Sequence, residues 1–194
     1  MKTTYSLIAV ALAAVIALPV SSRAQETEVA GEPQHYNGAL GFHSVTAPLG
    51  GRWWFGGQRV GLDAGLGFRS SPAPSYDERL SDWALDVGVP IVVKHWDRVH
   101  LLFRPGFLYE SDEQQTSTPP DPFGTDDETT LSITAELEAE VFIVNNFSVS
   151  ASHGIGFSSV SPAGGGDSET TFGTLGNNFT NIGFHIYFFG GSQN

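Results

Sequence analysis

The sequence contains no cysteine in its 194 residues. Disulfide bonds therefore do not hold the chain together, and a lipid anchor attached through cysteine is excluded. Basic residues are also scarce, because 9 Lys and Arg stand against 21 Asp and Glu, for a formal net charge of −12. Such a balance excludes the basic footprint that nucleic-acid-binding proteins carry. It favours well-solvated loops, although it does not define a fold.

Long apolar runs are absent after residue 20. A transmembrane helix needs roughly 18 or more consecutive apolar residues, and no later segment approaches that length. If this part of the chain enters a membrane, it must do so as a closed β-barrel, because only closure satisfies the backbone groups of every strand in hydrocarbon.

The N-terminal segment has the three-part pattern of an export signal. Lys2 gives a positive start, Leu7 to Val20 is an almost unbroken apolar run, and Ser22 and Ala24 are small residues placed before a cleavage site. We expect Sec-type export and cleavage near Ala24 rather than a membrane-anchoring helix, because the run is short and small residues follow it. The rest of the chain, about 170 residues, suffices for one domain and carries 7 basic against 21 acidic residues, a formal charge of −14.

Apolar residues recur at every second position between residues 38 and 189. In the segment 131–143, for example, Leu, Ile, Ala and Val alternate with Ser, Thr and three glutamates. Successive side chains of a strand point to opposite faces, so these segments predict strands with one apolar and one polar face. We expect eight strands, at about 38–46, 50–56, 59–70, 81–93, 98–110, 129–143, 146–161 and 178–189.

The connections between the expected strands alternate in length. Short turns lie at 56–58, 94–97 and 145–146. Longer polar loops lie at 71–80, 111–128 and 162–177, and the last of these is glycine-rich, so we expect it to be flexible and exposed. Short turns on one side and long loops on the other are typical of outer-membrane barrels, with the short turns in the periplasm.

The sequence therefore predicts an all-β fold, an eight-stranded antiparallel up-and-down transmembrane β-barrel over residues 38–189. A signal peptide (1–24) and a short polar leader (25–37) precede the barrel, and a polar tail (190–194) follows it. The alternation alone also fits a soluble, lipocalin-like barrel with its apolar face inside and its charges in water.

Three features favour a barrel whose polar face lines the interior. The polar face is rich in glycine, which a narrow, crowded interior needs and a solvent-facing surface does not. The apolar faces approach the roughly 9–11 residues that a tilted strand needs to cross hydrocarbon. Aromatic residues gather at strand ends (53–55, Trp96 and 187–189), as they do in the girdles of membrane barrels. The glycines of the polar face are Gly61, Gly65, Gly67, Gly88, Gly106, Gly154, Gly156 and Gly183.

The last expected strand resembles the assembly signal of outer-membrane barrels. Asn181 is followed by Gly183 and then by the apolar residues Ile186 and Phe188. The chain departs from the pattern at its end, where residues 190–194 follow the terminal aromatic. The segment 52–68 is similar to the first hairpin of small barrels of the outer-membrane protein A and X kind. This resemblance, which extends over about 38–189, implies a fold and an outer-membrane location but no reaction.

Charged residues occupy the polar face that would line the lumen. They are Asp63, Arg69, Asp86, His100, Arg104, Glu136, Glu138, Glu140 and His185. Because 98–110 and 129–143 are neighbouring strands, we expect Arg104 opposite the three glutamates. Buried charges must be paired or neutralised, so the set forms either a proton or ion path or a salt-bridged plug. We favour the plug, because the interior of an eight-stranded barrel is just wide enough for its own side chains.

A serine and histidine cluster raises the question of catalysis. Ser150, Ser152 and His153 lie close together in the strand 146–161. Some eight-stranded barrels remove acyl chains from lipid A, and their pattern places the serine two residues after the histidine, where this chain has Ile155. His153 also has no acid on its own face of this strand. We therefore predict no catalytic residue, no cofactor and no enzyme, and a lipid A-modifying hydrolase is the weakest alternative.

The loop 111–128 is acidic and could attract divalent cations held by lipopolysaccharide, because hard cations take carboxylate oxygens. Its carboxylates belong to Asp112, Glu113, Asp121, Asp126, Asp127 and Glu128. Their spacing matches no defined calcium loop, so we expect a solvated acidic loop and no metal site.

Together these features predict a non-enzymatic, monomeric protein of the outer membrane of a Gram-negative-type bacterium. Its lumen is plugged, and its role is structural or of the adhesion type. The expected partners are outer-membrane lipid and lipopolysaccharide, the barrel-assembly machinery during insertion, and a surface ligand at the loops 71–80, 111–128 and 162–177, with no nucleic acid. The alternative is a soluble periplasmic barrel that binds an apolar ligand.

Overall fold

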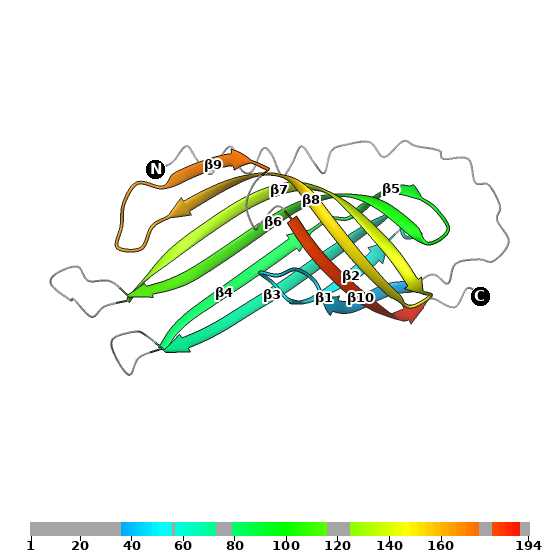
Figure 1. Ribbon diagram of the computed structural model, residues 1–194, viewed down its shortest axis with the longest axis horizontal. Helices are drawn as coiled ribbons and strands as arrows, with labels where there is room; N and C mark the ends of the chain where they lie inside the picture. Colours follow the sequence, from blue (N-terminus) through cyan, green and yellow to red (C-terminus); the bar gives the residue numbers. More distant parts are fainter. Residues whose placement is uncertain (1–35, 56, 73–78, 116–124, 175–179, 191–194) are drawn as a thin grey trace. The chain divides into compact units, whose positions relative to one another are not determined.

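The computed structural model describes residues 36–55, 57–72, 79–115, 125–174 and 180–190 (Figure 1). The predicted signal peptide, most of the predicted leader and the tail from residue 191 lie outside the described residues. In the part of the chain that is described, no helix is long and apolar enough to cross a membrane.

The described residues form ten β-strands. They are β1 (Tyr36–Phe42), β2 (Leu49–Phe55), β3 (Val60–Pro72), β4 (Arg79–Gly88), β5 (Ile91–His95), β6 (Val99–Gln115), β7 (Thr125–Val144), β8 (Phe147–Ser161), β9 (Glu169–Gly173) and β10 (Thr180–Gly190). Each of the eight predicted segments is present. The predicted segment 81–93 is divided into β4 and β5 at Pro90, which has no N–H to donate to a ladder. Both pieces pair with β3 and β6, so together they occupy the position of one strand in the barrel wall.

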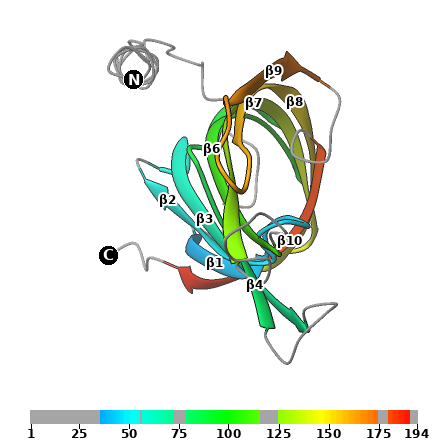
Figure 2. The ribbon, with the colours of Figure 1, turned by 90° about the vertical axis from the view of Figure 1, so that its left-hand side faces the viewer.

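The sheet closes on itself as an eight-stranded antiparallel barrel. Consecutive strands pair from β1 through β4, on to β6, β7 and β8, and β10 pairs with both β8 and β1. Figure 2 shows β10 in red between the yellow β8 and the blue β1. At the β2–β3 turn, Gly57 and Gln58 both have positive φ, at 70° and 65°, as the favoured two-residue hairpin turn requires.

The polar face of the wall lies inside the barrel and the apolar face lies outside, as predicted. Leu66, Phe68 and Leu137 are 58%, 76% and 58% exposed, whereas Asp63 and Glu140 are fully buried. A soluble barrel has the opposite arrangement, because burial of apolar surface is the main favourable term in folding in water. The buried apolar cluster is correspondingly small and consists of Ala39, Trp54, Leu102 and Tyr187.

Two of the predicted girdle aromatics lie inside instead of outside. Trp54 and Tyr187 are buried, because they occupy the same face of their strands as Arg52 and His185. Their polar groups find partners in the lumen, where the Trp54 Nε1 donates to the Tyr187 hydroxyl at 3.4 Å. The other girdle residues with described side chains are exposed on the outer surface, namely Trp53, Phe55, Trp96 and Phe188.

A second row of aromatics borders the apolar surface toward the long-loop end. Phe68 of β3 is opposite Trp83 of β4, and the ring of Trp83 packs on Tyr109 of β6 at 4.8 Å between centroids. Beyond this row the outward positions become polar, at Ser70, Ser81 and others. The outer surface is therefore an apolar band with aromatic residues at both borders.

Several strands extend farther toward the long loops than the sequence predicts. The β6–β7 ladder continues to Gln115 and Thr125, so half of the predicted acidic loop 111–128 is strand, and the other half, 116–124, lies outside the described residues. The predicted loop 162–177 contains β9, which pairs with β8. Threonine and phenylalanine favour strands, and they make up most of β9. The described residues of that loop, 162–174, are mostly exposed, as predicted, but five of them belong to the sheet.

Candidate functional site

The charged lumen is the candidate functional site, and strand register assembles it. Glu136, Glu138 and Glu140 are alternate residues of β7, so all three point inward. In the β6–β7 ladder Arg104 lies opposite Glu136 and His100 lies opposite Glu140. The lumen therefore receives its charges in layers set by the hydrogen-bonded pairing of the wall.

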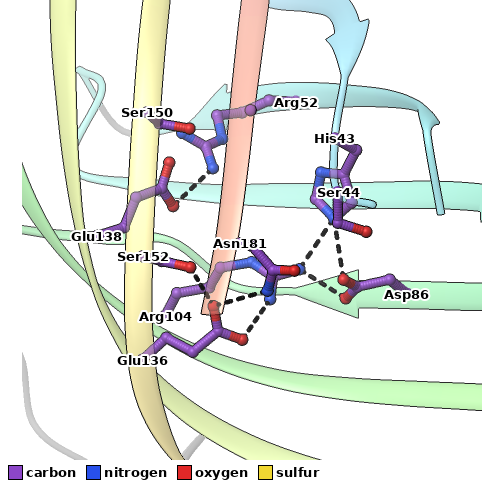
Figure 3. A pocket seen from close by; sticks show the side chains of 11 residues that line it. His43, Ser44, Arg52, Asp86, Arg104, Glu136, Glu138, Ser150, Ser152 and Asn181 are labelled. Carbon is purple, nitrogen blue, oxygen red and sulfur yellow. Dashed lines mark hydrogen bonds and ion pairs between the residues drawn. The ribbon is translucent and has the colours of Figure 1, made fainter. Parts of the chain in front are cut away.

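Arg104 is the centre of the layer nearer the long loops. Its Nη2 donates to Asp63 Oδ1 at 2.8 Å and to Asp86 Oδ1 at 2.7 Å, and its Nη1 donates to Glu136 Oε1 at 3.1 Å. His43 completes the layer, with Nε2 at 3.4 Å from Asp86 Oδ2 (Figure 3). One guanidinium thus bonds three carboxylates, all of them buried.

The carboxylate of Glu136 is saturated with donors. Besides Arg104, its Oε1 accepts from the Thr134 hydroxyl at 2.9 Å. Its Oε2 accepts from the Ser152 hydroxyl at 2.5 Å and from the Asn181 amide at 3.3 Å. A buried carboxylate with this many donors is held in one position.

Arg52 is the centre of the layer nearer the short turns. Its Nη2 donates to Asp63 Oδ2 and to Glu138 Oε2, both at 2.9 Å. Its Nη1 lies 3.6 Å from Glu140 Oε2, which is an ion pair without a direct hydrogen bond. The guanidinium also lies 5.7 Å from the centre of the Trp54 ring. Asp63 bridges the two layers, because it accepts from both arginines.

Glu140 is surrounded by hydroxyl groups that donate hydrogen bonds to it and by imidazoles that lie beyond hydrogen-bond distance. Its Oε1 accepts from the Ser148 hydroxyl at 2.6 Å and from the Tyr187 hydroxyl at 2.7 Å. His100 Nδ1 lies 3.8 Å from Oε2, and His185 Nδ1 lies 3.7 Å from Oε1. These two distances are too long for direct hydrogen bonds.

The structure buries all but one of the charged residues predicted to line the lumen. The buried ones are Asp63, Asp86, His100, Arg104, Glu136, Glu138, Glu140 and His185. Arg69 has the predicted inward parity, but its side chain is 74% exposed and pairs with Asp82 at 2.6 Å. The reason is that β2 meets β3 only as far as Leu66, so no strand covers Arg69 on that side.

The expectation that Arg104 faces all three glutamates is wrong for two of them. Of the three glutamates, Arg104 contacts only Glu136, and Arg52 forms ion pairs with Glu138 and Glu140. Arg52 and His43 are lumen residues that the sequence did not identify. The outward positions of Trp53 and Phe55 in the same strand are the signal that places Arg52 inside, but the intervening Trp54 obscures that alternation.

Two glycines make space for these charged side chains. A Cβ atom at Gly88 would collide with the guanidinium of Arg104, and one at Gly65 would come within 2.5 Å of His43 Cδ2. No side chain fits at either position without displacement of a lumen group. The glycine-rich inner face therefore belongs to a crowded interior, as the composition predicted.

The serine and histidine cluster is not assembled into a catalytic pair. Ser150 and Ser152 are buried in the lumen, whereas His153 points outward and its Nδ1 lies 2.7 Å from the Thr180 hydroxyl. The wall of the barrel separates the serines from the imidazole, since neighbouring residues of a strand face opposite sides. The Ser152 hydroxyl donates to Glu136 and therefore braces a carboxylate.

The acidic residues of β6 and β7 make local contacts instead of forming one cluster. Glu113 accepts from the Ser81 amide at 2.9 Å, and Asp126 accepts from the Gly164 amide at 2.7 Å. Among the residues that the structure describes, no group of three or more side chains is placed to hold a metal ion. Asp121 lies outside the described residues.

A small cavity lies between the two arginine layers, with His43, Asp86, Glu138, Ser150 and Asn181 in its lining. Its space suffices for roughly one water molecule. The arrangement can therefore hold charges and water in fixed places, and side chains occupy the rest of this part of the lumen. Comparison of the chain with protein-family models, with curated proteins and with solved structures finds no match.

Proposed function

We propose that this chain is an integral β-barrel of a bacterial outer membrane, with a plugged lumen and a structural or surface-interaction role. The observation that carries the proposal is the inverted distribution of side chains, with an exposed apolar band outside and buried charges inside. Monomeric soluble proteins rarely expose large contiguous apolar patches. A band that surrounds the wall is the surface that lipid would cover.

The height of the band supports the same proposal. Outward apolar residues run from Val60 to Phe68 on β3 and from Leu131 to Ile143 on β7. At about 3.3 Å per residue and a tilt of about 40°, these runs span roughly 20–30 Å along the barrel axis. The apolar band of known outer-membrane barrels is about 25 Å tall.

The alternative of a soluble barrel with an apolar ligand lacks support from the interior. The interior of such a carrier is lined by apolar side chains around a cavity of several hundred Å³. Here the lumen holds carboxylates and guanidiniums that bond to one another, and the described cavity has polar and charged groups in its lining. An apolar ligand placed there would leave those groups without partners, at a cost of several kcal/mol.

Tryptophan fluorescence tests the proposal, because the four tryptophans divide between the two faces. Trp53, Trp83 and Trp96 are 42%, 45% and 49% exposed on the outer surface, whereas Trp54 is 5% exposed in the lumen. We expect single-tryptophan variants refolded into vesicles of brominated phospholipid to lose most of their emission at the three outer positions. The Trp54 variant should keep its emission and serves as the matched control.

The soluble alternative gives a different result in the same experiment. A soluble barrel would stay in the supernatant when the vesicles are pelleted, and none of its tryptophans would be quenched. Equal quenching of Trp54 and the outer tryptophans would instead show that the lumen is open to lipid and that the side-chain arrangement is wrong.

The proposed role is non-enzymatic, is performed by a monomer and is located at the cell surface. The short turns lie at one end of the barrel, and the opposite end carries the β6–β7 extension with Asp112, Asp126 and Glu128. In the proposed orientation that extension faces outward from the cell, where lipopolysaccharide and a surface ligand are the partners within reach. The last strand supports insertion by the assembly machinery of the barrels that it resembles, since Ile186 and Phe188 lie on the outer face.

A further inference from the structure

The lumen contains more negative than positive charge. Within the described residues, the buried acidic side chains are Asp63, Asp86, Glu136, Glu138 and Glu140. The buried basic side chains are Arg52 and Arg104, and the buried imidazoles are His43, His100 and His185. With neutral imidazoles, five carboxylates face two guanidiniums, which leaves three negative charges uncompensated. A buried charge without a counter-charge costs several kcal/mol, so a deficit of this size must be reduced.

The unsatisfied polar atoms lie mainly in one half of the lumen. They include Glu140 Oε2, Glu138 Oε1, His100 Nδ1 and both ring nitrogens of His185, none of which has a hydrogen-bond partner. His185 is 1% exposed and Glu140 is fully buried, so bulk water does not supply the missing partners. In the other half, by contrast, Arg104 and the hydroxyl and amide donors saturate Glu136.

Every strand around Glu140 contributes to its surroundings. The like charge of Glu138 lies two residues away on β7. His100 lies opposite on β6, and the centre of the His95 ring lies 4.6 Å from that of His100. From β2 comes Arg52, which is shared with Asp63 and Glu138, and from β8 comes the neutral hydroxyl of Ser148. β10 contributes His185 and the hydroxyl of Tyr187.

Positive charge is scarce around Glu140. The guanidinium of Arg52 alone faces the carboxylates of Asp63, Glu138 and Glu140. An ordinary imidazole or phenol is neutral at pH 8, so His100, His185 and Tyr187 would add no positive charge in those forms.

We propose that Glu140, with Glu138, His100 and His185 around it, is a proton-binding site, named here the Glu140 site, which holds a proton in the folded barrel at a pH where the unfolded chain has released it. The bound proton removes one of the three negative charges that the two arginines do not compensate. Protons fit the site better than a metal ion, because no group of three ligands in the described residues is placed around a common point. The inference rests on the buried charges and not on the membrane location.

The proposal fixes the sign of the pH dependence. If the folded state holds more protons than the unfolded state, stability falls as the pH rises. Each extra proton lowers the folding equilibrium constant tenfold per pH unit. We therefore expect the urea midpoint of the barrel, folded in detergent micelles, to fall steadily between pH 7 and pH 9, where unfolded carboxylates are ionised and unfolded imidazoles are neutral.

Glu140→Gln is the informative variant. Glutamine keeps an oxygen that accepts from Ser148 and Tyr187 but removes one of the three uncompensated charges. We expect this variant to have a higher urea midpoint than the wild type at pH 9 and a shallower dependence on pH. The matched control is Glu136→Gln on the same strand, which loses a charge that Arg104 compensates. The control should be less stable at every pH and should keep the wild-type slope.

Two results would overturn the proposal. One is an equal pH slope for the wild type and Glu140→Gln, which would mean that Glu140 holds no extra proton. The other is a barrel that takes up no protons on folding at pH 8, measured directly with a pH indicator in weakly buffered solution. A midpoint that rises with added Ca²⁺ or Zn²⁺ while the proton count stays at zero would assign the missing charge to a metal ion instead.

Discussion

Replacement of Arg104 by methionine is the most direct test of whether the lumen is a dry, bonded plug. Methionine has nearly the volume of the arginine stem, so the change removes the charge with little loss of packing. Asp63 keeps its bond to Arg52 at 2.9 Å, but Asp86 loses its 2.7 Å bond and is left with His43. Glu136 keeps only the neutral donors from Thr134, Ser152 and Asn181.

The magnitude follows from burial and not from distance. Loss of one partner of a buried ion pair costs about 3–5 kcal/mol, because the remaining charge stays buried without compensation. The free energy of unfolding falls by about 2 kcal/mol per molar of urea, so the urea midpoint of unfolding should fall by roughly 1.5–2.5 M. The matched control is Arg69→Met, which breaks a shorter contact of 2.6 Å to Asp82 but from a side chain that is 74% exposed. Exposed pairs contribute about 0–1 kcal/mol, so its midpoint should change by less than about 0.5 M.

The measurement is urea-induced unfolding in micelles, followed by tryptophan emission and by the shift of the unheated protein on gel electrophoresis. Equal losses for Arg104→Met and Arg69→Met would refute the reasoning. Such a result would mean that water penetrates the Arg104 layer and screens its three carboxylates. The volume of methionine keeps the interpretation clear, because a cavity cannot account for a large loss in the Arg104 variant.

Two further predictions concern the wall and the lumen as a whole. Leu137→Arg puts a charge in the middle of the apolar band and should cost about 2–4 kcal/mol in phospholipid vesicles. Ser159→Arg puts the same charge at the border of the band, beside Leu131, and should cost at most about 1 kcal/mol; both costs are measured by urea unfolding. Similar costs at the two positions would contradict a lipid-facing surface. Pure folded protein in planar bilayers should show no sustained large currents, because side chains close the lumen at both arginine layers. Stable open-channel currents that persist at high protein purity would contradict the plug.

The sequence predicts the wall of this barrel well because one signal dominates it. A period of two over 131–143 or 60–69 has only one regular explanation, and inward and outward positions follow from it. The same rule placed Glu136, Glu138 and Glu140 correctly in the lumen. Glycine at positions such as Gly88 then decided which face lies inside, and the collision of a Cβ atom with Arg104 gives the physical reason.

The sequence predicts less well where a strand ends and which charges meet. Arg69 has the inward parity that the sequence predicts, but it lies beyond the end of the neighbouring strand β2. The alternation of side chains does not specify how far each strand extends along the barrel axis. The pairing of Arg52 with Glu138 joins positions 86 residues apart across the lumen. That contact depends on the closure of the barrel and on its stagger, neither of which the alternation of side chains specifies. The strand β9 was missed for a related reason, since five residues inside a glycine-rich loop give too short a pattern.

The lumen network also explains how so narrow a barrel keeps its cross-section. Hydrogen bonds of the wall join only adjacent strands, whereas Arg52 of β2 bonds Glu138 of β7 and Tyr187 of β10 bonds Glu140 of β7 across the interior. Asp63 couples these braces to Arg104, so the two layers share a carboxylate. An open path would require both guanidiniums to leave their partners together. At about 3–5 kcal/mol for each layer, and a factor of ten for every 1.4 kcal/mol, the open form is populated less than about once in ten thousand molecules. In the proposed function, interaction with the surroundings is therefore left to the outer band and the extended strands.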